Sequence, residues 1–253
     1  MVHFSQPTLH NRLLRALSAE DFGLVQPHLG EVALKQGDVL IEPNEPIEHV
    51  HFPEHGISSI VTTTAHDGRR IEVGIYGREG MSGTSLLLGA DRTPHEHFYQ
   101  VAGSALVIGA DELGGAIRQS ASMNRLFLRY VQAFQVQIAY TALSNGTYTI
   151  EERLARWLLM CHDRIDGNEL ALTHEFLGMM LGVRRSSVTL ATQVFEGAQV
   201  IAARRGRLHI LNRAKLEEIA GDSYGPPEAE YARLIGRPGD GLGVSELSAL
   251  DRG

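Results

Sequence analysis

Apolar residues change their spacing along the chain near residue 30. Between residues 9 and 29 they recur at helical intervals, which predicts one or two short helices. From residue 31 to about residue 107 they form short alternating runs separated by turn residues. These runs lie at residues 39–41, 50–52, 57–60, 71–75 and 98–108. Several short strands at close spacing are typical of a β-sandwich or a jelly roll.

The longest helical pattern covers about residues 122–143. Apolar residues recur there every three or four positions and form one stripe. The stripe consists of Met123, Leu126, Phe127, Tyr130, Val131, Phe134, Ile138 and Ala142. A long helix between two domains, with an apolar seam, predicts a parallel interface between two copies of the chain. The alternative is that this stripe packs on the chain's own sheet.

Residues 172–211 have the pattern of two short helices joined by a tight turn. Thr173 is the expected N-cap of the first helix. Gly182 supplies the positive φ that the turn needs, and small Gly178 lets the two helices cross closely. The second helix is expected over residues 185–196, and a two-stranded wing follows it. This unit predicts a helix-turn-helix, although an ordinary amphipathic helix pair is the simpler alternative.

The second helix begins with guanidinium groups and short hydroxyl donors. The N-terminal end of such a helix enters the major groove of DNA, where arginine pairs with a guanine edge. Three arginines around a glycine at the wing tip suit a clamp on backbone phosphates, although a solvated run of charge is possible. We expect Arg185 to contact a base edge. The candidate DNA-binding residues are Thr173, Arg184, Arg185, Ser186, Ser187, Thr189, Arg204, Arg205 and Arg207.

The net charge of −7 argues at first against a nucleic-acid partner, but the charge is unevenly distributed. Residues 1–118 contain 8 Lys and Arg against 15 Asp and Glu, whereas residues 173–213 contain 6 against 2. A basic module inside an acidic chain can bind DNA through its local field.

Length and composition restrict the remaining possibilities. The 253 residues are enough for two modest domains. No apolar run approaches the roughly 18 residues of a membrane span, and the N-terminus lacks the features of a secretory signal. We therefore expect a cytoplasmic protein without a membrane partner. Cys161 is the only cysteine, so one chain cannot form a disulfide or an all-cysteine metal site. We expect its thiol to be buried in packing.

The order of β-roll, long helix and winged helix-turn-helix resembles the cyclic-AMP receptor protein and FNR (Crp/Fnr) family of bacterial transcription regulators. The resemblance covers roughly residues 25–215. Its best segments are VHFPEHGISSIV, RRIEVGIYGREGMSGTSLLLG, TIEERLARWLLMCHDRI and LTHEFLGMMLGVRRSSVTLA. It implies an α+β protein that binds a palindromic operator in double-stranded DNA as a homodimer, with RNA polymerase as a further partner.

Four regions follow from this organisation. We expect a cyclic-nucleotide-binding-like sensor roll with N-terminal helices over residues 1–118, and a dimerisation helix over 119–148. The winged helix-turn-helix domain is expected over 149–220, beginning with a capping box of Thr149 and Glu152. Residues 221–253 are rich in glycine, proline and acids, which predicts a flexible tail.

The expected ligand site departs from the family pattern. In its cyclic-nucleotide binders, a Gly-Glu pair holds the ribose and an Arg-Ser/Thr-Ala run holds the phosphate. The matching stretches here have no glutamate, and Pro94 replaces the alanine. By resemblance the candidate ligand contacts are Gly80, Met81, Ser82, Gly83, Arg92 and Thr93. A ribose without its carboxylate loses charge-assisted hydrogen bonds, so we expect DNA binding without cyclic nucleotide. FNR-type iron–sulfur sensing needs cysteines that the chain lacks, so the effector stays unassigned.

The second helix departs from the family as well. Many members have Arg-Glu-x-x-x-Arg there, and the matching residues are Arg185, Ser186 and Leu190. The operator should therefore differ from the family's best-known one.

A metal-dependent cupin-like β-roll, enzymatic or not, is the alternative of a different class. His49 and His51 are two apart, as are His95 and His97, and such pairs share one face of a strand. However, apolar Val50 and the residue after His51 should take the inner face, which directs the first pair outward. No Ser-His-Asp spacing, Walker loop or paired-carboxylate motif is present, so no enzymatic activity is predicted.

Overall fold

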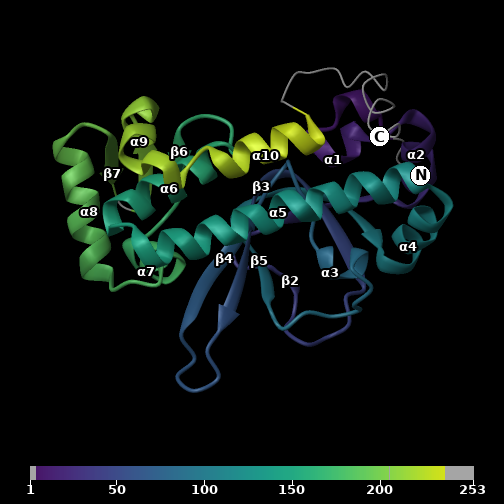
Figure 1. Ribbon diagram of the computed structural model, residues 1–253, viewed down its shortest axis with the longest axis horizontal. Helices are drawn as coiled ribbons and strands as arrows, with labels where there is room; N and C mark the ends of the chain where they lie inside the picture. The colour runs from purple at the N-terminus through teal and green to yellow at the C-terminus, as the bar shows by residue number, and fades with distance from the viewer. Residues whose placement is uncertain (1–3, 205, 237–253) are drawn as a thin grey trace, which may run out of the picture.

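The computed structural model describes residues 4–204 and 206–236. A long helix, α5 (Ala121–Thr147), runs along the length of the molecule over the strands of a β-sheet domain, and a smaller helical domain lies at its C-terminal end (Figure 1). The elements before the sheet are the 3-10 turn Gln6–Thr8, α1 (Arg12–Ala16), α2 (Ala19–Val25) and the 3-10 turn Gln26–His28. The N-terminal helices are confirmed.

Five antiparallel strands form the sheet of the roll. They are β1 (Gly30–Leu34), β2 (Val39–Ile41), β3 (His49–Thr63), β4 (Arg70–Tyr76) and β5 (Glu96–Gly109). Their order is β1-β5-β3-β4, and β2 pairs with the opposite end of β5 from β1. Two helices complete the roll, α3 (Thr84–Leu87) and α4 (Ala110–Gln119).

The separate strands expected at 50–52 and 57–60 are one strand, so that division of the chain is wrong. Pairing of β3 with β5 shifts register three times between Pro53 and Ser58. Gly56 has a φ of 87°, and a Cβ there would lie 2.4 Å from the carbonyl oxygen of Val101. Buried Glu54 accepts hydrogen bonds from two backbone N–H groups before α1. The polar interruption is therefore a bulge that bends the strand, not its end.

The apolar stripe of α5 faces the roll of its own chain. Met123, Phe127, Tyr130 and Phe134 are buried together with residues of the sheet and of α1 and α4. The prediction that this stripe forms the interface between two copies is therefore wrong for its buried residues, whereas Ala142 at its end is exposed. The spacing of the stripe fits a coiled coil and an intrachain contact equally well. In this structure the buried residues of the stripe make the intrachain contact.

The small domain is a winged helix-turn-helix. Its helices are α6 (Ile150–His162), α7 (His174–Leu181), α8 (Arg185–Gly197) and α9 (Arg213–Ala220). Its strands, in the order β6-β8-β7, are β6 (Glu169–Leu170), β7 (Ile201–Arg204) and β8 (Arg207–Ile210). The predicted capping box of Thr149 and Glu152 begins α6.

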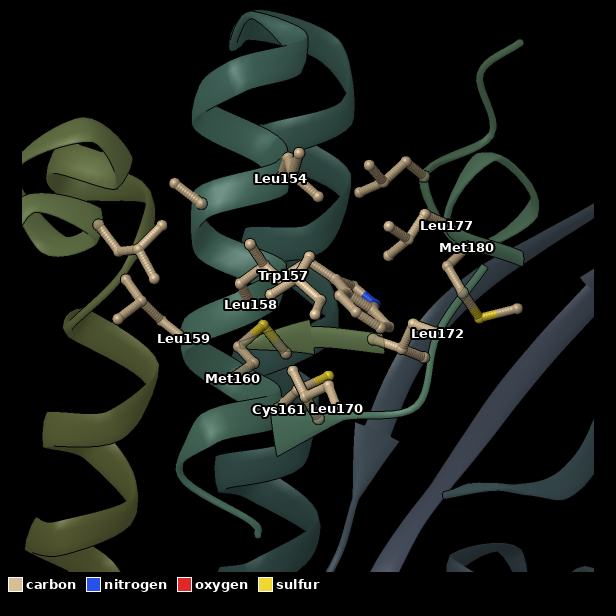
Figure 2. Packing of buried hydrophobic residues seen from close by; sticks show 14 of the residues in the cluster. Leu154, Trp157, Leu158, Leu159, Met160, Cys161, Leu170, Leu172, Leu177 and Met180 are labelled. Atoms are coloured by element: carbon tan, nitrogen blue, oxygen red, sulfur yellow. The ribbon is translucent and has the colours of Figure 1, made fainter. Parts of the chain in front are cut away.

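The roll and the winged-helix domain share one hydrophobic core. Ile57, Ile75 and Phe98 of the roll are buried in the same cluster as α6, α7 and α8. Figure 2 shows Trp157 and Met180 on the side of α6 that faces the strands of the roll. Cys161 is fully buried in this cluster, which confirms its predicted packing role, and burial raises the pKa of its thiol.

Two buried polar contacts cross the same boundary. Glu79, after β4, pairs with Arg164, after α6, at 2.7 Å. Glu72 on β4 accepts hydrogen bonds from Trp157 Nε1 and Ser59 Oγ, both at 2.7 Å. Because these groups are buried, breaking either contact would leave buried polar atoms without hydrogen-bond partners, which is costly.

Residues 221–236 are folded, so the predicted flexible tail is wrong for this part, and the rest of it lies outside the described residues. A 3-10 turn, Gly221–Ser223, leads into α10 (Pro226–Ile235), which packs along α5. Ile235 is buried in the core of the roll, and the Tyr231 hydroxyl donates to the carbonyl oxygen of Glu79 at 2.8 Å. Gly225 and Pro226 begin a helix rather than interrupt one, because proline is favoured in a first helical turn.

Candidate DNA-binding site

The helix-turn-helix forms with the predicted local devices. Thr173 Oγ1 accepts a hydrogen bond from the N–H of Phe176 at 3.1 Å and caps α7. Gly182 has a φ of 62°, in the left-handed region that glycine tolerates. A Cβ on Gly178 would lie 3.0 Å from the carbonyl oxygen of Val183, so the small residue is needed where the helices meet.

One face of α8 is buried and the opposite face is exposed. Val188, Ala191 and Phe195 are buried in the domain core. Arg185 and Ser186 are exposed at the N-terminal end of the helix, which Figure 1 places at the outer end of the molecule. α8 is therefore accessible along its length although α7 beside it packs on the roll.

A cleft of about 440 Å³ separates the start of α7 and α8 from the wing. Four of the predicted residues, Thr173, Arg185, Arg204 and Arg207, line it together. Glu196 Oε1 accepts a hydrogen bond from the N–H of an alanine on β7 at 2.9 Å, which holds the wing against α8. A cleft between a helix end and a basic hairpin can accept a phosphate backbone.

The other predicted residues differ in their surroundings. Arg184 is the N-cap position of α8 and is exposed, whereas Ser187 is half-buried. Thr189 Oγ1 donates to the carbonyl oxygen of Arg185 at 3.0 Å and lies 3.1 Å from His174 Nδ1, so its hydroxyl already has partners. Arg205 lies outside the described residues.

The exposed face of α8 also includes residues that were not among the predicted contacts. Leu190 is 63% exposed, and Gln193 is exposed one turn further on. Their position opposite Val188, Ala191 and Phe195 could have been found from helical spacing alone.

The predicted ligand contacts of the roll are largely engaged within the protein. A Cβ on Gly80 would lie 2.2 Å from the Tyr130 hydroxyl, and the side chain of Met81 is buried. Ser82 Oγ accepts a hydrogen bond from the N–H of His51 at 2.8 Å.

The remaining candidates, Gly83, Arg92 and Thr93, also have contacts within the roll. Gly83 begins α3, where a Cβ would contact side chains of residues 47 and 50. The Thr93 carbonyl oxygen accepts from the N–H of Asn44, while exposed Arg92 pairs with Asp91 at 3.0 Å.

The histidine pairs of the roll do not form a metal site among the described residues. No group of three or more His, Cys, Asp or Glu is placed there to hold a metal ion. His49 is exposed, and burial lowers the pKa of His51 to about 4. His97 is buried 3.3 Å from the Tyr76 hydroxyl, and burial lowers its pKa to about 3. Val50 takes the inner face of β3, as predicted.

A β-roll, a long helix and a winged helix-turn-helix with an exposed second helix define the architecture of Crp/Fnr transcription regulators. Residues 152–219 match the family model described as the Crp-like helix-turn-helix domain. The chain therefore contains a Crp-like helix-turn-helix domain, and the resemblance found in its sequence is confirmed. A comparison with curated proteins finds no match.

Solved structures show the same fold. A transcriptional regulator of the Crp/Fnr family from Eubacterium rectale is 18% identical, with a TM-score of 0.65 over 83% of this chain and 98% of that one. FixK2 from Bradyrhizobium japonicum is 17% identical, with a TM-score of 0.64 over 76% and 98% of the two chains. A CRP-family regulator from Thermus thermophilus is 18% identical, with a TM-score of 0.63 over 76% and 97%.

In the described part of the chain, no helix has both the length and the apolar character that a membrane crossing needs.

Proposed function

We propose that the protein is a transcription regulator that binds an inverted-repeat operator in double-stranded DNA as a homodimer, without cyclic nucleotide. The observation that carries this proposal is the exposed α8 beside a cleft lined by Arg185, Arg204 and Arg207. In this arrangement α8 enters the major groove while the wing contacts the backbone. Contact with RNA polymerase and a cytoplasmic location are further expectations of such a regulator.

The arginines have different tasks in this proposal. Arg185 lies in the first turn of α8, where its guanidinium can reach a base edge or the adjacent phosphate. Arg204 and Arg207 flank the wing tip and contact the backbone, as we expect of Arg205. Arg207 is paired with Glu169 in the free protein, so DNA would replace a carboxylate by a phosphate at this guanidinium.

The test is selection of binding sites from random duplexes by the purified protein with no added ligand. Enrichment of an inverted repeat supports the proposal, and no enrichment by a folded dimer refutes effector-independent binding. Alanine at Arg204 or Arg207 should weaken binding to all sequences alike and lower the salt slope by about 1 each. Arg69→Ala, at an exposed arginine of the β3–β4 hairpin, is the matched control and should leave the slope unchanged.

The homodimer uses the outward face of α5 in this proposal. The exposed residues there follow spacings of four and three along the helix, as in a coiled-coil seam. They are Leu128, Gln132, Gln135, Ala139 and Ala142. The small alanines allow two helices to approach closely, and Leu128 is a large apolar side chain that is 40% exposed in the single chain.

Ala139→Arg tests this interface, because two arginines would face each other in the seam without a counter-charge. We expect a monomer by size-exclusion chromatography with light scattering. Ala33→Arg, on exposed β1, should leave the mass of the wild-type dimer unchanged. A dimeric Ala139→Arg variant would place the interface elsewhere.

Binding without cyclic nucleotide is supported by how the expected ligand contacts are used. By resemblance, Gly80 and Met81 stand where the cyclic-nucleotide binders have their Gly-Glu pair. Met81 is buried in the core of the roll, and a Cβ on Gly80 would lie 2.2 Å from the Tyr130 hydroxyl. Cyclic AMP should therefore leave the thermal unfolding midpoint unchanged. A midpoint that rises with cyclic AMP concentration would contradict this part of the proposal.

A further inference from the structure

Two aliphatic side chains are exposed next to each other on α8. Leu190 is 63% exposed and Val194 is 57% exposed, and a spacing of four residues places them on the same face of the helix. Neither side chain is needed for the domain core, which Val188 and Phe195 fill from the opposite face. An adjacent pair of exposed apolar side chains on the helix that faces DNA points to an apolar partner on the DNA itself.

The face that carries Leu190 also carries short polar side chains but no charge in its centre. Ser186 precedes Leu190 by one turn, and Gln193 follows it by three residues, so the three side chains lie together. Arg185 is five residues before Leu190, and with 3.6 residues per turn this spacing places it on another face. Arg185 lines the cleft beside the wing, which agrees with its position on a different face from Leu190.

Major-groove chemistry supplies a specific partner for this face. The C5-methyl group of thymine is an apolar group on a base edge in that groove, and aliphatic side chains pack against it. Glutamine can donate to N7 and accept from the N6 amino group of adenine with both ends of its amide. A face of Ser186, Leu190 and Gln193 therefore matches a thymine and a neighbouring adenine better than guanine, whose edge favours arginine.

We propose that α8 recognises a thymine methyl group through Leu190 and a nearby adenine through Gln193, so that each half-site contains an A·T-rich step under the middle of the helix. This inference rests on the proposed DNA-binding function. It concerns two of the bases that are recognised, whereas Arg204 and Arg207 of the wing determine how tightly any DNA is held.

The test begins with the duplex selected by the wild-type protein. Each thymine of the half-site is replaced in turn by deoxyuridine, which keeps base pairing and removes only the methyl group. At one thymine we expect the dissociation constant to rise about fourfold, which corresponds to about 0.8 kcal/mol at 1.4 kcal/mol per tenfold. Leu190→Ala should bind the thymine duplex about as weakly as the wild type binds the uracil duplex, and should show no uracil penalty.

Matched variants separate this contact from general effects. Leu88→Ala removes a leucine of the roll that is 59% exposed, and it should retain the full uracil penalty. Gln193→Ala should lose preference at one adenine, measured with 7-deazaadenine, while it keeps the penalty at the thymine. Since both α8 side chains are exposed, the thermal unfolding midpoints of the variants should match the wild type.

Each outcome decides one question. If the wild-type protein selects no duplex, the proposed DNA-binding function fails. If it selects one whose half-site has no thymine, or if uracil changes nothing at any position, DNA binding stands and the recognition by Leu190 is refuted. The same refutation follows if Leu190→Ala keeps the wild-type penalty.

Discussion

Glu72 should make the stability of the protein fall between acidic and neutral pH. Its carboxylate is buried where β4 meets α6, with Ser59 and Trp157 as hydrogen-bond donors. Burial raises its pKa from 4.5 to about 7, although those two hydrogen bonds and the charges of Arg156 and Arg164 favour the ionised form. In the folded protein this group therefore keeps its proton over a pH range in which the unfolded chain has lost it.

The contribution of Glu72 to the free energy of unfolding depends on the difference between its pKa values in the folded and unfolded states. Below pH 4.5 the carboxyl is protonated in both states, so the contribution is fully present there. As the pH rises towards 7, the unfolded chain ionises first and the folded state loses relative stability. One pKa unit corresponds to about 1.4 kcal/mol, so the change from 4.5 to about 7 corresponds to about 3.5 kcal/mol in full, of which about 3 kcal/mol develops between pH 4.5 and pH 8.

Glu72→Gln is the informative change, because its amide preserves the network. The carbonyl oxygen can accept from Trp157, and the amino group can donate to Ser59 Oγ, whose single hydroxyl hydrogen then donates to Gln100 Oε1. Urea unfolding at pH 4.5 and pH 8, followed by the fluorescence of the single tryptophan, gives the free energy of unfolding. We expect the variant to gain about 3 kcal/mol relative to the wild type between these pH values.

The control is Glu31→Gln, at an exposed position on β1, whose profile should run parallel to that of the wild type. A difference between Glu72→Gln and the wild type that does not vary with pH would refute the reasoning. It would mean that water or structural relaxation solvates the carboxylate in the folded state.

Three further predictions concern separate parts of the structure. Gly182→Ala should destabilise the protein by about 1–3 kcal/mol in urea unfolding, because φ is 62° and the new Cβ would lie 2.7 Å from the side chain of Ile71. The control is Gly197→Ala, which should not destabilise the protein, because this glycine is helical and a Cβ there would contact nothing within 4 Å. The thiol of Cys161 should react with a disulfide reagent only after denaturant is added, because it is buried and its pKa is raised. Tyr231→Phe should cost about 1 kcal/mol by thermal unfolding through loss of one hydrogen bond, and an unchanged midpoint would show that α10 is not held by this contact.

The parts that sequence reasoning located correctly depend on local chemistry. Thr173 caps α7 by a hydrogen bond to a residue three positions later, and Gly182 forms the turn through its own positive φ. The capping box of Thr149 and Glu152 likewise involves residues three apart. Such signals require no knowledge of the remaining fold, so the helix-turn-helix boundaries could be predicted to within a residue or two.

The errors concern partners that are distant in sequence. α5 has two faces with regular spacing, and hydrophobic periodicity alone does not show that Phe127 faces the chain's own roll while Leu128 faces outward. The composition of residues 221–236 indicates flexibility, but Tyr231 and Ile235 have binding partners on the roll that no local pattern reveals. Glu54 interrupts an apolar run because its carboxylate accepts hydrogen bonds from backbone N–H groups 43 and 44 residues earlier, which no local pattern shows either.

The shared core also bears on how two copies of α8 would meet an operator. Half-sites lie about 34 Å apart, so a dimer must hold both helices at one spacing. Here the winged-helix domain is held to the roll by the buried pair of Glu79 and Arg164 and by the hydrogen bond from Trp157 to Glu72. Rotation of this domain on the roll would separate both pairs and leave buried polar groups unpaired, which is costly. The interdomain contacts therefore favour one orientation of α8, and operator affinity should depend on residues that never touch DNA.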